Sequence, residues 1–310
     1  MLLSLCTHYP HFILAQSLLM GSAVAFLQFP AFALMGHYFD KRRAAALGIV
    51  VSGSSVGGLV FPIVLSKLLN SSSGASLGFG WSIRIVAFVM APFMLFACVV
   101  LRPRFPPRKT SRIWVAEPWR SRQYVGLVVA LYFMMMGMWT PLFYIPVYAV
   151  RRDMTPLLAS YLLAIINGAS TLGRVIPGII ADRLGKVNMF AFAGVGTGIV
   201  VFCINMPKTN AGIIVYSVFF GFISGTIISS GSAAISVCAK DPRTLGTYMG
   251  MGMGFAAFAV LIGPPINGAL LDRYGGFEQI SIFSGVMSLT GGFIALSAKF
   301  GTPEGIFGKV

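Results

Sequence analysis

The chain has 310 residues, of which 56% are hydrophobic and only 10% charged, whereas a soluble globular domain is about a quarter charged. This composition excludes an ordinary soluble protein and a disordered one. The 23 Lys and Arg and 8 Asp and Glu give a net charge of +15. They cluster between long apolar runs, as in the loops that flank membrane helices, so we expect a lipid bilayer and no nucleic acid as partner.

The apolar runs are long enough to cross a membrane, since a bilayer requires about 20 apolar residues in a helix. They lack the short alternating segments of an outer-membrane barrel. We therefore predict an all-α, polytopic membrane protein with about nine transmembrane helices. In chain order, the expected spans are residues 11–36, 44–66, 84–102, 123–149, 155–181, 188–206, 211–238, 245–270 and 279–298.

The longest connection is a basic, proline-containing linker at residues 103–122. It predicts three parts: a partial N-terminal bundle of three spans (1–102), the linker itself, and a C-terminal six-helix bundle (123–310). Sixteen Lys and Arg fall on the side of the linker and six on the other side. Because basic loops stay in the cytoplasm, we expect the linker to be cytoplasmic and the amino terminus to lie outside.

The fifth span carries polar residues on one helical face. Asn167, Ser170, Thr171 and Arg174 recur at steps of three and four. Arg174 lies eight residues before Asp182, or about 12 Å deeper along the helix axis. An Arg at that depth costs at least about 2–3 kcal/mol unless it meets water, an anion or a partner. We favour a substrate-binding role for all four residues, the alternative being an Arg that snorkels to headgroups or braces two helices.

The segment that follows this face predicts a gate. Gly178 and Gly185 permit tight backbone geometry, while Asp182 and Arg183 are placed to pair with a neighbouring helix end in one state of the gate. All eight carboxylates lie in loops or at span ends, so no mid-membrane proton acceptor is evident. The three histidines precede residue 40 and common catalytic motifs are missing, so we expect neither an enzyme nor a metal or cofactor site.

Three parts of the sequence resemble the monocarboxylate-transporter-like family of the major facilitator superfamily, especially its fungal members. They are residues 38–48 with 52–58, residues 173–185, and residues 261–268. The resemblance implies a twelve-helix fold of which the first three helices are missing here. It also implies that Arg174 contacts a substrate carboxylate. Animal members of the family carry an acidic residue four positions before the arginine, where this chain has Ser170. This difference argues against proton coupling by a pair formed from that position and Arg174.

These observations together predict a carrier, a symporter or uniporter, that moves a small organic anion of the monocarboxylate kind by alternating access. Two alternatives remain open. One is an efflux carrier for a secondary metabolite, and the other is a truncated membrane protein that serves as a receptor or scaffold without transporting. We expect an integral, multi-pass protein in the plasma membrane in preference to a vacuolar or other internal membrane.

Overall fold

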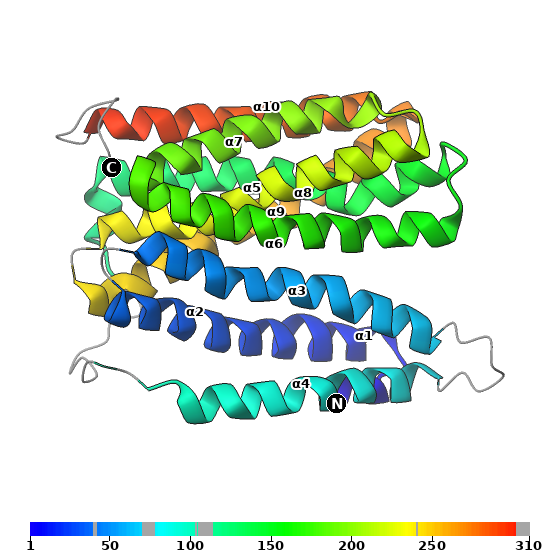
Figure 1. Ribbon diagram of the computed structural model, residues 1–310, viewed down its shortest axis with the longest axis horizontal. Coiled ribbons are helices and arrows are strands. Elements are labelled where there is room, and N and C mark those ends of the chain that lie inside the picture. Colours follow the sequence, from blue (N-terminus) through cyan, green and yellow to red (C-terminus); the bar gives the residue numbers. More distant parts are fainter. Residues whose placement is uncertain (40–41, 70–77, 103, 105–113, 240, 302–310) are drawn as a thin grey trace.

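The computed structural model describes residues 1–39, 42–69, 78–102, 104, 114–239 and 241–301. Within these residues, nine helices are long and apolar enough to cross a membrane. They run side by side along the long axis of the molecule (Figure 1). This confirms the predicted all-α, polytopic fold. Half of the expected linker, residues 103 and 105–113, lies outside the described residues.

The first span is built from α1 (Tyr9–Phe12), a π-helical stretch (Ile13–Met20) and α2 (Gly21–Tyr38). The next two are α3 (Arg43–Leu69) and α4 (Gly78–Val100). After the linker come α5 (Arg122–Val150), α6 (Pro156–Leu184), α7 (Lys186–Phe202), α8 (Asn210–Cys238), α9 (Leu245–Tyr274) and α10 (Glu278–Ser297).

One predicted boundary is wrong, because α4 begins at Gly78 instead of near residue 84. Arg84 therefore lies inside a helix, not in a loop. Its Nε donates to Ser4 Oγ at 3.0 Å, and its guanidinium lies 5.0 Å from the centre of the Trp81 ring. These partners allow the charge of Arg84 to lie within the first two turns of a membrane helix.

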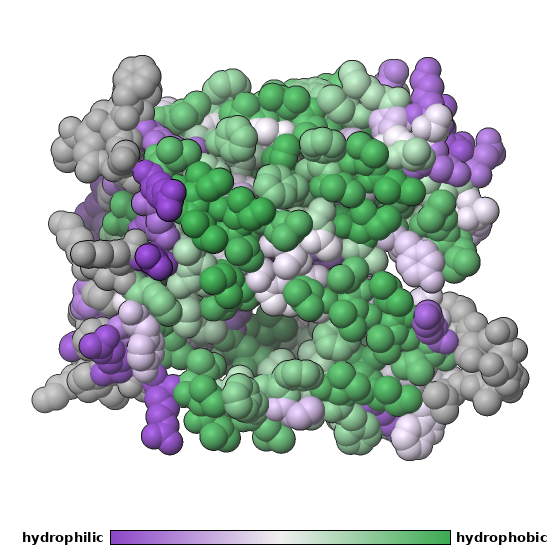
Figure 2. Space-filling model, in the orientation of Figure 1, coloured by the Kyte–Doolittle hydropathy of each residue, from purple (hydrophilic) through white to green (hydrophobic). Residues whose placement is uncertain are grey.

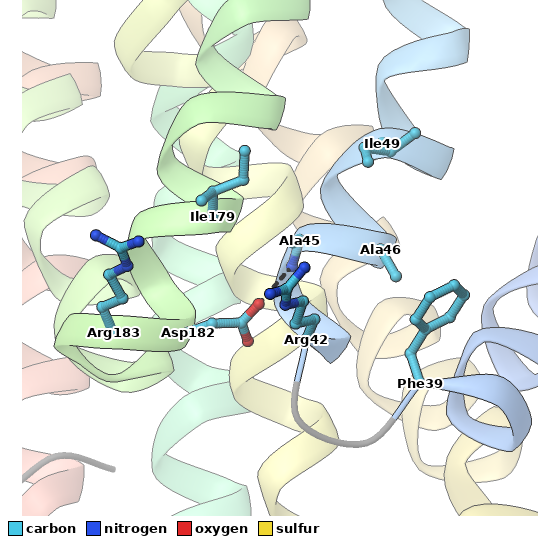
Figure 3. A pocket seen from close by; sticks show the side chains of 8 residues that line it. All are labelled: Phe39, Arg42, Ala45, Ala46, Ile49, Ile179, Asp182 and Arg183. Carbon is cyan, nitrogen blue, oxygen red and sulfur yellow. Dashed lines mark hydrogen bonds between the residues drawn. The ribbon is translucent and has the colours of Figure 1, made fainter.

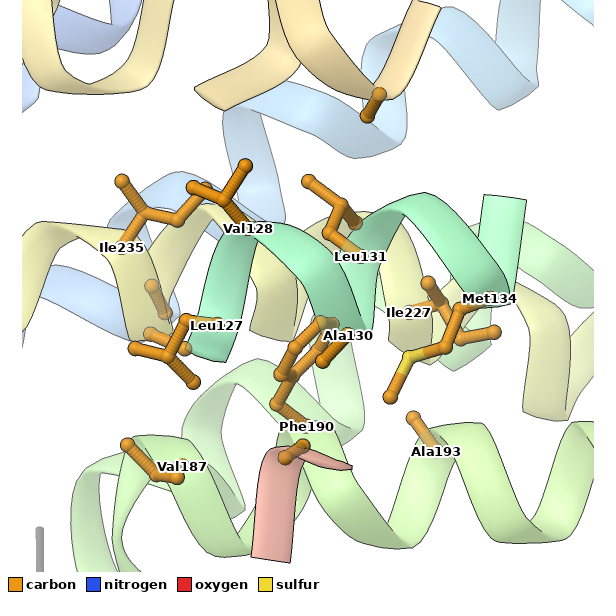
Figure 4. Packing of buried hydrophobic residues seen from close by; sticks show 14 of the residues in the cluster. Leu127, Val128, Ala130, Leu131, Met134, Val187, Phe190, Ala193, Ile227 and Ile235 are labelled. Carbon is orange, nitrogen blue, oxygen red and sulfur yellow. The ribbon is translucent and has the colours of Figure 1, made fainter. Parts of the chain in front are cut away.

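The main core lies among the helices that follow the linker. In the most apolar stretch of α5, 61% of the residues are buried. In the corresponding stretch of the first span 6% are buried, and in that of α4 none are. Figure 4 shows the centre of this core, where Ala130 and Met134 of α5 lie beside Phe190 of α7 and Ile227 of α8. The helices before the linker are consequently held by contacts on fewer sides.

The ends of the bundle are polar and its middle is an apolar belt (Figure 2). The ends of α2, α6 and α8 and the starts of α3, α7 and α9 lie together at one end, on the left in Figure 1. We call this the basic end, because Arg42, Arg183 and Arg243 lie at or beside these helix ends. Gly185 makes the turn from α6 to α7 possible with a φ of 100°, which side chains other than that of glycine rarely tolerate.

A polar network is buried within the six helices after the linker. Thr140 Oγ1 of α5 and Ser284 Oγ of α10 are 2.6 Å apart. Asn267 of α9 donates from Nδ2 to Thr140 at 2.8 Å and accepts from Ser284 at 3.1 Å. Because unpaired polar groups are costly in lipid, these bonds fix the mutual rotation of three helices.

We expect Ser284→Ala to lower the free energy of unfolding by about 1 kcal/mol, since it breaks both interhelical bonds of this hydroxyl. The matched control is Ser217→Ala. Ser217 is equally buried, but among the described residues its hydroxyl bonds only to Ile213 O of its own helix, so its loss should cost less than about 0.5 kcal/mol. Equal losses of stability on unfolding in mixed micelles would show that the network does not couple the helices.

Candidate functional site

α3 and α6 meet closely near the basic end, and we call the contact between residues 44–58 of α3 and residues 167–182 of α6 the seam. Glycines make this approach possible. A Cβ on Gly48 would lie 2.5 Å from the backbone oxygen of Arg174, and one on Gly178 would lie 3.0 Å from Ala44 O. The backbones of the two helices therefore touch with no side chain between them at these positions.

Arg174 reaches across the seam from α6 to α3. Its side chain is buried, and Nη1 donates to Val51 O at 2.8 Å and to Ser54 Oγ. Its Nε is buried without a hydrogen-bond partner among the described residues. In this arrangement Arg174 braces two helices, which was the alternative interpretation from the sequence, and it retains an unused donor.

Two further residues of the polar face lie against α3. Ser170 accepts a long hydrogen bond of 3.4 Å from Ser55 Oγ. Asn167 lies so close to Gly58 that a Cβ there would be 2.7 Å from Asn167 Oδ1. The lipid-exposed side of α6 is marked by Leu172, which is 57% exposed. The polar face of α6 is thus turned toward α3.

Thr171 differs from the rest of that face. Its hydroxyl donates to Asn167 O of the same helix at 3.1 Å, and the side chain is only half-buried. Hydrogen bonding to the preceding turn is a common way for a membrane helix to satisfy a threonine. The structure therefore brings three of the four candidate substrate residues, Asn167, Ser170 and Arg174, to the seam.

Asp182 joins the end of α6 to the start of α3. Its Oδ1 accepts from Ala44 N at 3.1 Å and its Oδ2 from Ala45 N at 3.0 Å. These N–H groups belong to the first turn of α3, where no backbone acceptor is available and the helix dipole favours an anion. Arg183 is exposed and points away from Asp182 (Figure 3). Of the two charged gate candidates, only Asp182 holds the helices together here.

The α3 half of the seam was not singled out from the sequence as a site. Its residues Val51, Ser54 and Ser55 supply the partners of Arg174 and Ser170. The signal available was the small and polar run from Ser52 to Gly58, which is consistent with simple helix packing as well. A second contact, between Gly36 of α2 and Leu245 of α9, also escaped sequence analysis.

Asp182→Asn is expected to loosen the seam at the basic end. An amide has one acceptor oxygen, so one backbone bond is lost along with the charge, a cost of about 1 kcal/mol. Opening should rise roughly fivefold. The measurement is the rate at which Ser55→Cys reacts with an impermeant thiol reagent applied from the basic side, against a background that lacks this cysteine.

The matched control for this prediction is Asp241→Asn. Asp241 also lies at the basic end, but it accepts from Arg243 N within its own turn at 2.9 Å. Its replacement should leave the labelling rate within about twofold, because no interhelical bond is lost. Equal acceleration by both variants would mean that negative charge in general, and not the cap on α3, protects the seam.

The structure is a bundle of membrane-length apolar helices in which a buried arginine joins α6 to α3. The sequence profile described as "Major Facilitator Superfamily" matches residues 1–210 and 171–306. The chain therefore belongs to this superfamily. The superfamily comprises transporters and not enzymes, as the absence of catalytic motifs predicted.

Two curated fungal relatives are similar over nearly the whole chain. The aspyridones efflux protein apdF of Emericella nidulans is 46% identical over 299 residues, covering 96% of this chain and 60% of the relative. The agnestins efflux protein AgnL12 of Paecilomyces divaricatus is 35% identical over 314 residues, covering 99% and 70%. The chain thus spans about 60–70% of the length of these relatives.

Solved structures show the same fold. The human organic anion transporter MFSD10 (TETRAN) superposes with a TM-score of 0.71 at 16% identity, over 95% of this chain and 73% of that protein. The match to the sequence profile confirms the predicted resemblance at the level of the superfamily. The monocarboxylate-transporter-like assignment has no such support, because the names of the curated relatives describe efflux proteins.

Proposed function

We propose that this chain takes part in the export of a small organic acid, a secondary metabolite, from the cytoplasm by alternating access. The names of the relatives favour efflux over the uptake of monocarboxylates. The acidic character of the substrate is supported by one observation, the buried Arg174 with an unused Nε donor. A buried guanidinium is the group that best recognises a carboxylate or another planar anion.

The arrangement of the seam suggests how such a cycle proceeds. Here the basic end, which we take as the cytoplasmic side, is closed by Asp182 on the first turn of α3 and by Arg174 on Val51 O and Ser54 Oγ. Opening requires that α3 and α6 separate and that both sets of bonds break. An anion entering from the cytoplasm then replaces Val51 O and Ser54 as the partner of Arg174.

Release on the opposite side follows when the seam re-forms. As α3 returns, Ser54 and Val51 O compete with the anion for the same guanidinium nitrogen, which lowers the affinity of the carrier for its substrate in the closed state. A differential affinity between two states is what a carrier needs to couple binding to a conformational change. Asp182 contributes by stabilising the closed state without touching the substrate.

The proposal is tested by transport into inside-out vesicles that contain the full chain, so that the basic end faces the medium. Radiolabelled organic acids are compared with their methyl esters, with protein-free vesicles as the blank. We expect the acid of at least one pair to accumulate about tenfold faster than its ester. Equal rates for every pair would overturn the acid preference, and the absence of any transport would favour a receptor or scaffold.

A further inference from the structure

A pocket of about 650 Å³ opens beside the seam at the basic end. Figure 3 shows it bounded by the start of α3, the end of α6 and the residue that follows α2. The side chains that define its chemistry are Arg42, Arg183, Asp182, Ile49, Ile179 and Phe39. The pocket thus combines two guanidinium groups with apolar walls.

The charge of this pocket is positive in effect. Arg42 precedes α3, Arg183 lies in the last turn of α6, and both side chains are exposed. The acid between them, Asp182, already uses both oxygens on the backbone N–H groups of Ala44 and Ala45. Its charge is therefore largely balanced by the helix terminus, which leaves the two arginines to attract an outside anion.

The walls of the pocket face lipid. Ile49 is 58% exposed and Ile179 is 46% exposed. Both lie nearer the middle of the membrane helices than the two arginines do. Figure 2 shows apolar surface across the middle of the molecule and polar surface at its ends. A ligand that satisfies the whole pocket needs an anionic head at the basic end and an apolar tail directed toward the membrane centre.

We propose that this pocket binds an anionic phospholipid. Its phosphate lies between Arg42 and Arg183, and one acyl chain runs along Ile49 and Ile179. Charge complementarity and the apolar wall select a lipid over a soluble phosphate, which would leave the isoleucines without a partner. Anionic lipids are concentrated in the cytoplasmic leaflet, the side that the basic loops predict for this end.

Such a lipid would act as a clamp on the seam. Arg42 belongs to the α3 side and Arg183 to the α6 side, so a single phosphate bridges two helices that must separate when the basic end opens. Lipid binding itself does not depend on the proposed export, because it requires only the closed seam. Failure of transport and failure of lipid binding are therefore separate results.

The test counts phosphatidylserine bound to the purified full chain by native mass spectrometry during a lipid titration. The double variant Arg42→Gln with Arg183→Gln should weaken binding about tenfold or more, since each basic group near the membrane surface contributes severalfold to the binding of acidic lipid. The matched control is Arg120→Gln with Arg122→Gln, which removes the same charge from exposed residues near the basic end outside the pocket. This control should change binding less than twofold.

Three results would overturn the proposal. Equal weakening by the two double variants would show attraction to the basic face in general. Displacement of the lipid by excess glycerophosphoserine would show a site for a free anion, in which the isoleucine wall has no role. If the double variant does not fold, Arg183→Gln alone carries the test, with about threefold weaker binding expected. Unchanged binding in that single variant would likewise refute the lipid site.

Discussion

Gly48→Ala is expected to prevent the seam from closing and to reduce transport more than tenfold. The added Cβ would lie 2.5 Å from Arg174 O and 3.5 Å from Gly178 Cα. The first distance is too short for a non-bonded contact between carbon and oxygen. The oxygen belongs to the backbone of α6, so it cannot rotate away. The helices must separate by roughly 1 Å, because close-packed backbones have no other way to make room.

This separation would break the hydrogen bonds that hold α3 and α6 together nearby. The bonds from Ala44 N and Ala45 N to Asp182, at 3.1 and 3.0 Å, would stretch beyond hydrogen-bonding distance. The carrier would then favour the state open at the basic end. We expect Ser55→Cys in this background to react about tenfold faster with an impermeant thiol reagent applied from that side.

Gly53→Ala is the matched control for this prediction. Gly53 lies on the same helix five residues away, and a Cβ there meets nothing within 4 Å. Labelling and transport should stay within about twofold of the parent chain, with a slight gain in stability from the better helix former. If Gly53→Ala reduced transport as much as Gly48→Ala, glycine flexibility in α3 would matter more than the contact of Gly48 with α6.

The fold was accessible from the sequence because membrane insertion depends on sums over many residues. A run of about 20 apolar residues identifies a span whatever its neighbours are, and the predicted spans match the helices within a few residues in most cases. The exception, at α4, arose because Arg84 was taken as a boundary. A single charge marks a helix end only when it has no local partner, and Ser4 and Trp81 supply one.

Only half of the candidate site could be predicted from the sequence, for a geometric reason. The polar face around Arg174 follows from the period of one helix, so it could be read within α6 alone. Its partners on α3 depend on how two helices separated by more than a hundred residues align. Sequence periodicity contains no information on that register. The contact of Asp182 with Ala44 and Ala45 N–H groups was equally hidden, because backbone donors leave no residue signature.

The identity of the substrate was the property that the sequence predicted least well. An Arg within the membrane predicts an anion, but it does not distinguish lactate from a larger acid, since that depends on the volume and shape of the open cavity. Resemblance supplied the monocarboxylate, and the efflux proteins among the relatives point elsewhere. A role for Arg174 in either case rests on charge, which can be tested separately from shape.

Arg174→Ala should reverse the preference for acids, with acid transport falling about a hundredfold and ester transport less than threefold. The variant removes the charge that a carboxylate needs, and it also removes the bonds to Val51 O and Ser54 Oγ. Arg174→Lys should retain about a tenth of acid transport, because an ammonium keeps the charge but cannot form two parallel bonds. Both are measured per carrier in the membrane, with Leu172→Ala, on the lipid-exposed side of the same helix, as the control.

The ratio of acid transport to ester transport distinguishes two roles for Arg174, contact with the substrate anion and support of the contact between α3 and α6. If Arg174 served only to hold α3, its loss would slow acids and esters equally, and Arg174→Gln, which restores a donor toward α3 without charge, would recover both. If it binds the substrate anion, Arg174→Gln should remain as deficient toward acids as Arg174→Ala while transporting esters normally. Undiminished acid transport by Arg174→Ala at normal membrane levels would remove the support for an anionic substrate, and a neutral metabolite would then fit the seam better.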